Sequence, residues 1–279
     1  MASATTASGQ NDVLEETKPV SKKTLKLVTW NIDGLDPKNG YERTIAVCEK
    51  VREIKPDVLF FQEVIPMSWD TLTSYLSEYQ HFCQSNTLPY FHTIAVHKDR
   101  LEVVGDVAIT DFPNSQMLRH LLHCQVKFHG LQLHLFSSHL ESTSKEGPER
   151  KRQLHEAFNQ MATLRSEGEI SIFGGDLNLR DKEVKAVGIP DRAVDLWEAC
   201  GSSKEYEYTW DISTNDNLTW EFPNKPRMRF DRLYLCPADD QKIKPQKFSL
   251  IGTDRVISIG RFPSDHYGIY TEFICQPGK

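Results

Sequence analysis

Several features are missing from this 279-residue sequence, and each absence excludes a class of protein. No apolar run approaches the roughly 18 residues that a membrane-spanning helix needs, and the N-terminus lacks the basic-then-apolar pattern of a secretory leader. The six cysteines are far apart and form no CxxC pair. We therefore expect reduced, mostly buried thiols in an intracellular protein, and neither a membrane association nor a zinc site.

Positive charge is also in short supply. The formal net charge is −6, which is the wrong sign for a protein that coats a nucleic acid through many phosphate contacts. An enzyme that holds only the end of a strand, with a metal ion in its site, does not need a basic surface of that extent. The charge excludes a long nucleic-acid footprint and leaves a nucleic-acid substrate open.

Linker-like stretches and internal repeats are absent after the N-terminal segment. Residues 1–24 are polar, rich in Ser, Thr and Ala, and without hydrophobic periodicity, which predicts a disordered tail. The chain contains 14 Phe, 9 Tyr and 5 Trp, enough to bury a sizeable core. We therefore assign residues 25–279 to one globular domain.

Hydrophobic patterns predict many strands and few helices in that domain. Strands are expected at 25–30, 58–61, 131–138, 170–173, 230–235 and 269–273, and helices at 42–54 and 149–165. Because strands outnumber helices, the pattern predicts an α/β fold in which two mainly antiparallel sheets pack face to face and are flanked by helices. This arrangement is a four-layered α/β sandwich.

Polar side chains stand at or near the ends of the predicted strands. In chain order they are Asn31, Glu63, His139, Asp176 with Asn178, Asp231, and Asp265 with His266. Strand ends gathered on one edge of a sandwich would bring these groups together. Unpaired buried acids cost a great deal of free energy, so such a cluster makes sense if a cation and histidines offset the repulsion. Oxygen ligands of this kind suit Mg²⁺ or Mn²⁺.

Each of these residues also has a simpler interpretation when it is taken alone. A Glu after a strand is usually a solvated edge residue, a lone His is more often structural, and Asn31 is compatible with a turn. Gly174-Gly175-Asp176 alone is compatible with a plain turn. The other histidines that we interpret as structural or surface residues are His92, His97, His129 and His134.

The order of the polar positions resembles the endonuclease/exonuclease/phosphatase superfamily. Six motifs carry the resemblance over roughly residues 25 to 273: Thr29-Trp30-Asn31, Gln62-Glu63, Ser137-Ser138-His139, Gly175-Asp176-Leu177-Asn178, Asp231 and Ser264-Asp265-His266. It implies a DNase I-like fold and a metal-dependent phosphodiesterase. Finer matches, such as Thr29–Asp36 and Arg261–Gly268, resemble the branch that hydrolyses 5′-phosphotyrosyl bonds at DNA ends.

The resemblance implies roles at the metal and at the attacking water. Glu63 would be the main Mg²⁺ ligand, with Mn²⁺ as a substitute, and Asp265 would support the metal site or the water network. Asp176 would orient or deprotonate the water, while Asn31 and Asn178 would hold water and phosphate.

Further roles concern the phosphate and the substrate. His266, with its ring fixed by Asp231, would donate to the non-bridging oxygens. His139 and Ser142 would add donors, and Arg180 would contact a phosphate or the strand. Three candidates concern substrate choice. Trp210 is either a stacking platform for a base or a core residue, and Tyr90 would lie beside the leaving tyrosine or the strand. The segment Asn217–Arg227 is either a loop that grips the substrate or a long hairpin.

The implied substrate is a DNA 5′ end that carries the tyrosyl or peptide adduct of an abortive topoisomerase II reaction, with 5′-tyrosyl RNA left open. We expect a monomeric repair hydrolase of the nucleus and cytoplasm. An abasic endonuclease would need a wider basic face, and a sphingomyelinase or inositol phosphatase would show lipid-facing aromatics or Lys/Arg clusters. A non-catalytic binding module of the same fold would lack one of the catalytic residues.

Overall fold

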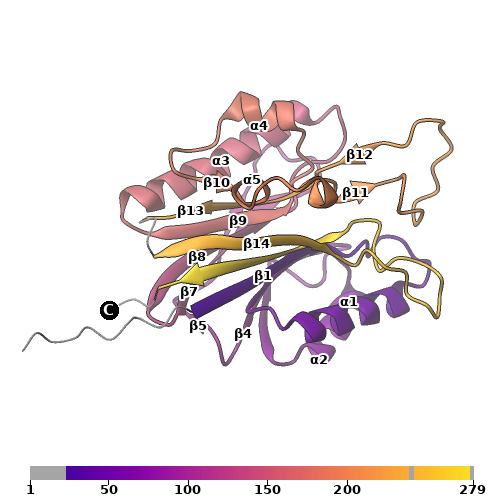
Figure 1. The fold of residues 1–279 in the computed structure, drawn as a ribbon, viewed down its shortest axis with the longest axis horizontal. Helices are drawn as coiled ribbons and strands as arrows, with labels where there is room; N and C mark the ends of the chain where they lie inside the picture. The colour runs from indigo at the N-terminus through magenta and orange to yellow at the C-terminus, as the bar shows by residue number, and fades with distance from the viewer. Residues whose placement is uncertain (1–22, 239–241, 277–279) are drawn as a thin grey trace, which may run out of the picture.

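The computed structural model describes residues 23–238 and 242–276. The predicted tail lies outside these residues except for Lys23 and Thr24, which already belong to the first strand. Figure 1 shows two sheets in the middle of the molecule and helices on both outer faces. The predicted four-layered α/β sandwich is confirmed.

The first sheet contains both chain segments that begin and end the domain. Its strand order is β14 (Ile243–Ile251), β15 (Gly268–Cys275), β1 (Lys23–Asn31), β2 (Val58–Val64), β4 (Phe91–His97) and β3 (Tyr79–Cys83). Only the β1–β2 pair in it is parallel, and the other neighbours are antiparallel. Its outer face is covered by α1 (Gly40–Ile54) and α2 (Pro66–Tyr75).

The second sheet is built in the same way. Its strand order is β10 (Val194–Asp195), β13 (Asp231–Cys236), β9 (Ile170–Asp176), β8 (Leu131–Ser138), β7 (His120–Phe128) and β5 (Glu102–Val103), with β6 (Ala108–Asp111) also paired to β7. Only β8 and β9 are parallel in it. The outer face is covered by α3 (Gly147–Ser166) and α4 (Asp181–Val187), whereas α5 (Leu196–Ala199) packs against β10, β13 and β14. No helix among the described residues has the length and apolar character to span a bilayer.

The central strands of each sheet are buried on both faces, which explains their sequence. In β1, Leu25 and Leu27 point into the core between the sheets. Val28 and Trp30 face the opposite way, into the core under α1 and α2. The same division in β2 makes Val58–Phe61 a continuous apolar run rather than an alternating one.

A short helical turn η1 (Lys204–Tyr206) and a hairpin, β11 (Trp210–Asp211) with β12 (Arg227–Met228), connect β10 to β13. The hairpin loop extends beyond the sheets at one end of the sandwich (Figure 1). It contains the predicted segment Asn217–Arg227, in which Phe222 is 67% exposed. The segment is therefore a long hairpin, and its role in gripping substrate stays a prediction.

The cysteines are unpaired, as predicted. Four are buried and two are partly buried. Burial raises the pKa of the Cys48, Cys124 and Cys275 thiols to about 12, so these side chains act as small apolar residues rather than nucleophiles.

Candidate active site

The ends of strands from both sheets bring the predicted catalytic side chains together. Parallel pairing of β1 and β2 sets Asn31 beside Gln62, and Glu63 follows directly. In the other sheet, β9 and β13 pair Asp176 with Asp231. The Asn31 amide joins the two halves, because its Nδ2 lies 3.0 Å from Glu63 Oε1 and 2.9 Å from Asp176 Oδ2. One amide thus donates to carboxylates from two different sheets.

Asp176 is the central carboxylate of this cluster. Its Oδ2 lies 3.3 Å from His139 Nε2 and 3.9 Å from His266 Nε2, and its Oδ1 accepts from the Asn178 backbone N–H at 3.1 Å. Burial alone would raise the pKa of Asp176, but the two imidazoles and the Asn31 amide hold that pKa well below its ordinary value. The group is therefore ionised at physiological pH and acts as a hydrogen-bond acceptor.

His266 is fixed by a buried carboxylate. Its Nδ1 lies 2.7 Å from Asp231 Oδ2. Burial opposes protonation, yet the charges of Asp231, Asp265 and Asp176 together raise the pKa of His266 well above its ordinary value. The Nε2 atom lies 3.9 Å from Asp176 and 4.0 Å from Asp265, which is too far for a hydrogen bond. A protonated His266 therefore presents its Nε2–H to the site.

Negative charge accumulates beside Glu63. Burial, together with the charges of Asp265 and Glu63, raises the pKa of Asp33 to about 8, even though Arg43 lies only 3.2 Å away. Excess negative charge of this kind, carried by oxygen donors, fits a divalent cation such as Mg²⁺. Three residues have ligand atoms within 4.8 Å of one another here, namely Glu63, His139 and Asp176.

The backbone is held in unusual conformations at these positions. Glu63 has φ 53° and Asn178 has φ 51°, a left-handed conformation that costs about 1–3 kcal/mol in a non-glycine residue. Gly175 has φ 139°, and a Cβ there would lie 2.0 Å from the Ser138 carbonyl oxygen. Gly174-Gly175 is therefore part of β9, where it permits a close approach to β8, and not a plain turn.

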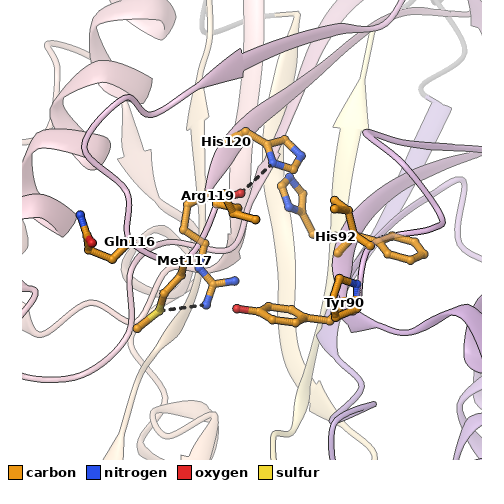
Figure 2. A pocket seen from close by; sticks show the side chains of 10 residues that line it. Tyr90, His92, Gln116, Met117, Arg119 and His120 are labelled. Atoms are coloured by element: carbon orange, nitrogen blue, oxygen red, sulfur yellow. Dashed lines mark hydrogen bonds between the residues drawn. The ribbon is translucent and has the colours of Figure 1, made fainter.

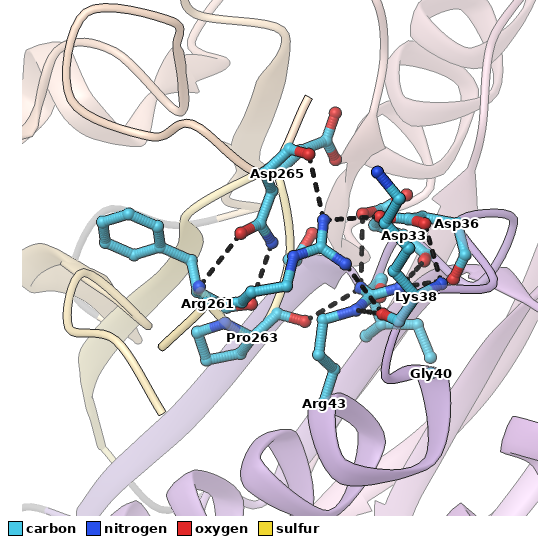
Figure 3. A network of polar contacts seen from close by, with 12 residues as sticks. Asp33, Asp36, Lys38, Gly40, Arg43, Arg261, Pro263 and Asp265 are labelled. Atoms are coloured by element: carbon cyan, nitrogen blue, oxygen red, sulfur yellow. Dashed lines mark hydrogen bonds and ion pairs between the residues drawn. The ribbon is translucent and has the colours of Figure 1, made fainter. Parts of the chain in front are cut away.

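A pair of arginines organises the loops around the acids (Figure 3). Arg43, 1% exposed, donates to the backbone oxygens of Ile32, Asp33, Asp36, Lys38 and Pro263, and to the Asp33 carboxylate. Arg261 donates to the Asp36 carboxylate and to the backbone oxygens of Lys38 and Asn217. The two side chains tie the loop after β1 to the segment that carries His266 and to the β11–β12 hairpin.

Replacement of Arg43 by Met is expected to destabilise the fold by about 3–5 kcal/mol, because it leaves Asp33 and several carbonyl groups buried without a donor. Urea unfolding followed by tryptophan fluorescence measures the change. Arg52→Met is the matched control, since Arg52 lies on the same helix and is exposed. An equal effect of the two substitutions would show that the network does not hold these loops.

The side of the site next to His139 is formed by Tyr90, Arg119 and Ser142. The Tyr90 and His139 rings are 6.4 Å apart, and the Arg119 guanidinium lies 5.3 Å from the centre of the Tyr90 ring. Ser142 Oγ lies 3.3 Å from Arg119 Nη2 and 3.3 Å from Met117 Sδ. The structure thus brings Tyr90 and Ser142 to the cluster, and their contacts with substrate stay predictions.

The opposite side, next to His266, is formed by Trp210. Its indole Nε1–H donates to Asp265 Oδ2 at 3.1 Å, and its ring meets the edge of Trp220 at 6.1 Å. Trp210 is only 9% exposed. Most of the ring is therefore packed inside, as the core interpretation had it, and stacking on the remaining surface stays a prediction.

Arg180 lies on this second side as well. Its guanidinium is 5.3 Å from the centre of the Phe230 ring, which is itself 6.4 Å from the His266 ring. Arg180 Nη1 donates to the Asn178 backbone oxygen at 2.8 Å. The half-buried cation is close enough to the cluster to meet an anionic substrate, and this role also stays a prediction.

Three residues of the site were not singled out from the sequence: Asp33, Arg43 and Arg119. Asp33 stands two residues after Asn31 in the run Thr29–Asp36, so its position was a usable signal. Arg43 lies within a helix and Arg119 in a loop before β7. Nothing in their local sequence distinguishes them from ordinary surface arginines, and only tertiary contacts reveal them.

Comparison with known proteins gives consistent results. The model of the Endonuclease/Exonuclease/phosphatase family matches residues 28–266. Tyrosyl-DNA phosphodiesterase 2 of Rattus norvegicus is 42% identical over 247 residues, which cover 88% of this chain and 66% of the relative. The Homo sapiens protein of that name is 38% identical over 257 residues, covering 91% and 69%. The chain thus spans about 66% of the length of the first of these relatives.

Solved structures give the same assignment. The crystal structure of D. rerio TDP2 complexed with single strand DNA product matches with a TM-score of 0.84 and 39% identity, over 90% of this chain and 98% of that chain. The human Nocturnin catalytic domain, 17% identical with a TM-score of 0.67, shares the fold. The chain therefore belongs to the endonuclease/exonuclease/phosphatase family, in which it is a homologue of tyrosyl-DNA phosphodiesterase 2.

Proposed function

We propose that this protein is a hydrolase that cleaves 5′-phosphotyrosyl bonds at DNA ends and leaves a 5′-phosphate. The complete, hydrogen-bonded set of Asn31, Glu63, Asp176, Asp231 and His266 carries this proposal, because a non-catalytic module has no need for two buried aspartates beside Glu63 in the left-handed conformation. The relatives' name supplies the substrate class. Such adducts arise from failed topoisomerase II reactions on chromosomal DNA, so the proposed hydrolysis would occur in the nucleus.

Glu63 would hold a Mg²⁺ ion, or Mn²⁺ in its place, beside Asp176 and with Asp265 in support. When bound, such an ion polarises a phosphate oxygen and offsets the charge of the diester. The oxygen-rich donor set and the raised pKa of Asp33, caused by burial and by the charges of Asp265 and Glu63, support a resident divalent cation.

Asp176 and its neighbours would act on the attacking water. An ionised carboxylate with a depressed pKa is a weak base, so Asp176 orients a water molecule by accepting its hydrogen bond more readily than it removes a proton. Asn31 holds Asp176 in place, and Asn178 completes the loop around it. His266, protonated and held by Asp231, would donate to a non-bridging oxygen, with His139 on the other side of Asp176.

The two sides of the cluster suit the two halves of the substrate. On the His266 side, Trp210, Trp220 and Phe230 provide aromatic surface for a DNA strand, with Arg180 near its phosphates. On the His139 side, the Tyr90 ring and the Arg119 guanidinium suit a tyrosine that departs as a phenolate. Arg119 makes no carboxylate ion pair within the described part of the chain, so its charge is available to the leaving group.

One Mg²⁺ per active site is expected to suffice. A tyrosine phenolate has a conjugate-acid pKa of about 10, far below that of a sugar alkoxide, so its departure needs less help from a second ion. Single-turnover rates measured against Mg²⁺ concentration should follow a single-site saturation curve. A sigmoidal dependence that requires two ions would contradict this expectation.

Replacement of Trp210 by Ala is expected to raise KM by about 5- to 150-fold, the equivalent of about 1–3 kcal/mol of lost base stacking. Trp210→Phe, which keeps a ring but loses the bond to Asp265, should retain most of the affinity. The measurement compares KM for substrates with a normal and with an abasic 5′-terminal nucleotide. If Trp210→Ala raises KM equally for both substrates, the ring is structural and not a stacking platform.

The proposed function is tested with two labelled oligonucleotides, a 5′-phosphotyrosyl strand and a duplex with an internal abasic site. Each is incubated with Mg²⁺ or EDTA and resolved on a gel. Mg²⁺-dependent conversion of the first to a 5′-phosphate is the expected result. Incision of the abasic duplex alone would assign the protein to the repair endonucleases of the same fold, and binding without cleavage would identify a non-catalytic module.

A further inference from the structure

A pocket of about 270 Å³ lies beside the site, beyond Tyr90 (Figure 2). Two loops form it, the one that leads into β4 and the one that leads into β7. It is lined by Leu88–His92 and Gln116–His120. The Tyr90 ring and Arg119, which form the His139 side of the active site, are also part of its wall. The pocket is therefore continuous with the catalytic cluster on that side.

Two buried polar atoms of this pocket lack a hydrogen-bond partner within the described residues, Nε of Arg119 and Nε2 of His120. The side chains are 6% and 2% exposed. Buried polar groups are nearly always satisfied, so two orphaned atoms in one pocket indicate a ligand or bound water.

The two orphaned atoms have opposite hydrogen-bonding character. Burial lowers the pKa of His120 and holds that of its stacked neighbour His92 well below the ordinary value, so both rings are neutral. His120 Nδ1 faces the Leu118 carbonyl at 3.4 Å, which makes Nδ1 the protonated nitrogen and leaves Nε2 as an acceptor. Arg119 Nε–H is a donor. The wall of the pocket thus contains one unpaired donor and one unpaired acceptor.

The rest of the wall is apolar or uncharged. Leu88, Pro89, Met117 and the 74%-exposed Leu118 provide apolar surface, and Arg119 is the single charged residue in the lining. A DNA strand would require several cations. A peptide group, with one N–H and one C=O next to an apolar side chain, matches this surface.

We propose that this pocket binds the peptide attached to the tyrosine of the adduct, through a backbone unit and a neighbouring apolar side chain. The proposal rests on the proposed function and extends it from the tyrosine to the protein remnant. Because the aromatic surface for the strand lies against His266 and the pocket opens beside His139, the two parts of the substrate leave the phosphate in different directions.

The test compares two 5′-phosphotyrosyl oligonucleotides, one bearing tyrosine alone and one bearing tyrosine within a short apolar peptide. The wild-type protein should show a KM about tenfold lower for the peptide-bearing substrate, as two hydrogen bonds and an apolar contact provide. His120→Phe keeps a ring beside His92 but removes the acceptor, and Leu118→Ala trims the exposed apolar edge. Both should lose this advantage and leave KM for the tyrosine substrate unchanged.

Two controls make the outcome decisive. His120→Asn restores a hydrogen-bond acceptor and should recover part of the advantage, while Ile257→Ala, a 98%-exposed apolar residue that does not line the pocket, should behave as wild type. A wild-type protein without peptide preference, or His120→Phe acting equally on both substrates, would overturn the proposal. Fluorescence anisotropy with a labelled phosphotyrosyl peptide measures peptide binding to the pocket without catalysis. This binding test remains valid even if neither substrate is cleaved and the proposed function fails.

Discussion

Replacement of Glu63 by Gln is expected to reduce kcat on a 5′-phosphotyrosyl oligonucleotide by about 10³-fold or more, while binding of the 5′-phosphate product strand is retained. The glutamine would keep the size of the side chain and an oxygen that accepts from Asn31, whose Nδ2 lies 3.0 Å from Glu63 Oε1. The substitution removes the negative charge that would hold Mg²⁺, and a loss of several kcal/mol of transition-state stabilisation corresponds to this factor.

Isothermal titration of the protein with Mg²⁺ separates this explanation from a general loss of structure. Glu63→Gln should weaken Mg²⁺ binding, and raised Mg²⁺ concentrations should restore part of the activity. Glu53→Gln, at an exposed position of α1, is the control and should match wild type in both measurements. Unchanged Mg²⁺ affinity in the Glu63 variant would move the metal to other carboxylates, Asp265 and Asp176 being the nearest alternatives.

Six strands of the two sheets could be predicted from the sequence, whereas the others could not. Residues 25–30, 58–61, 131–138 and 170–173 are strands as predicted, because their buried residues form either an alternating or a continuous apolar pattern. Strands β3 to β7, β10 to β12 and β14 were not identified. Half-buried edge strands such as Tyr79–Cys83 and Ala108–Asp111 carry polar side chains at inward and outward positions alike, which weakens the alternation on which the prediction depends.

The catalytic residues could be predicted for a different reason, since their motifs are local in sequence. Asn31, Glu63 and Asp176 each lie at the end of a strand or one residue before it, and the topology alone then brings them together. The contacts of Arg119 with Tyr90 and Ser142 depend on how three loops pack against one another. Hydrophobic periodicity contains no information on such packing, and the same holds for Arg43, one of whose acceptors is the Pro263 carbonyl, 220 residues away in the sequence.

Replacement of Asp231 by Asn is expected to lower kcat/KM by about 10²–10⁴-fold near neutral pH and to move the alkaline limb of its pH profile to lower pH. The asparagine amide oxygen would still accept a hydrogen bond from His266 Nδ1, so the ring stays in place. The carboxylate at 2.7 Å is the nearest of the charges that raise the pKa of His266, and its removal lowers that pKa. The donor to the phosphate is then lost at a lower pH.

The sign of this shift distinguishes the two possible roles of Asp231. If the residue only positions the ring, activity falls at every pH and the alkaline limb keeps its place. If its charge also keeps His266 protonated, activity falls and the limb moves toward acid, so the variant recovers part of its loss as the pH is lowered. A limb that moves toward alkaline pH would contradict both roles.

Stability must be followed in the same experiment. A raised folded-state pKa means that protonated His266 contributes stability that is fully present below pH 6.5, its ordinary pKa, and lost as the pH rises through the folded-state value. Circular dichroism at each pH therefore has to show an intact fold before a loss of activity is assigned to the proton on Nε2. Where the fold persists and the activity falls, the titration reports the donor that the phosphate needs.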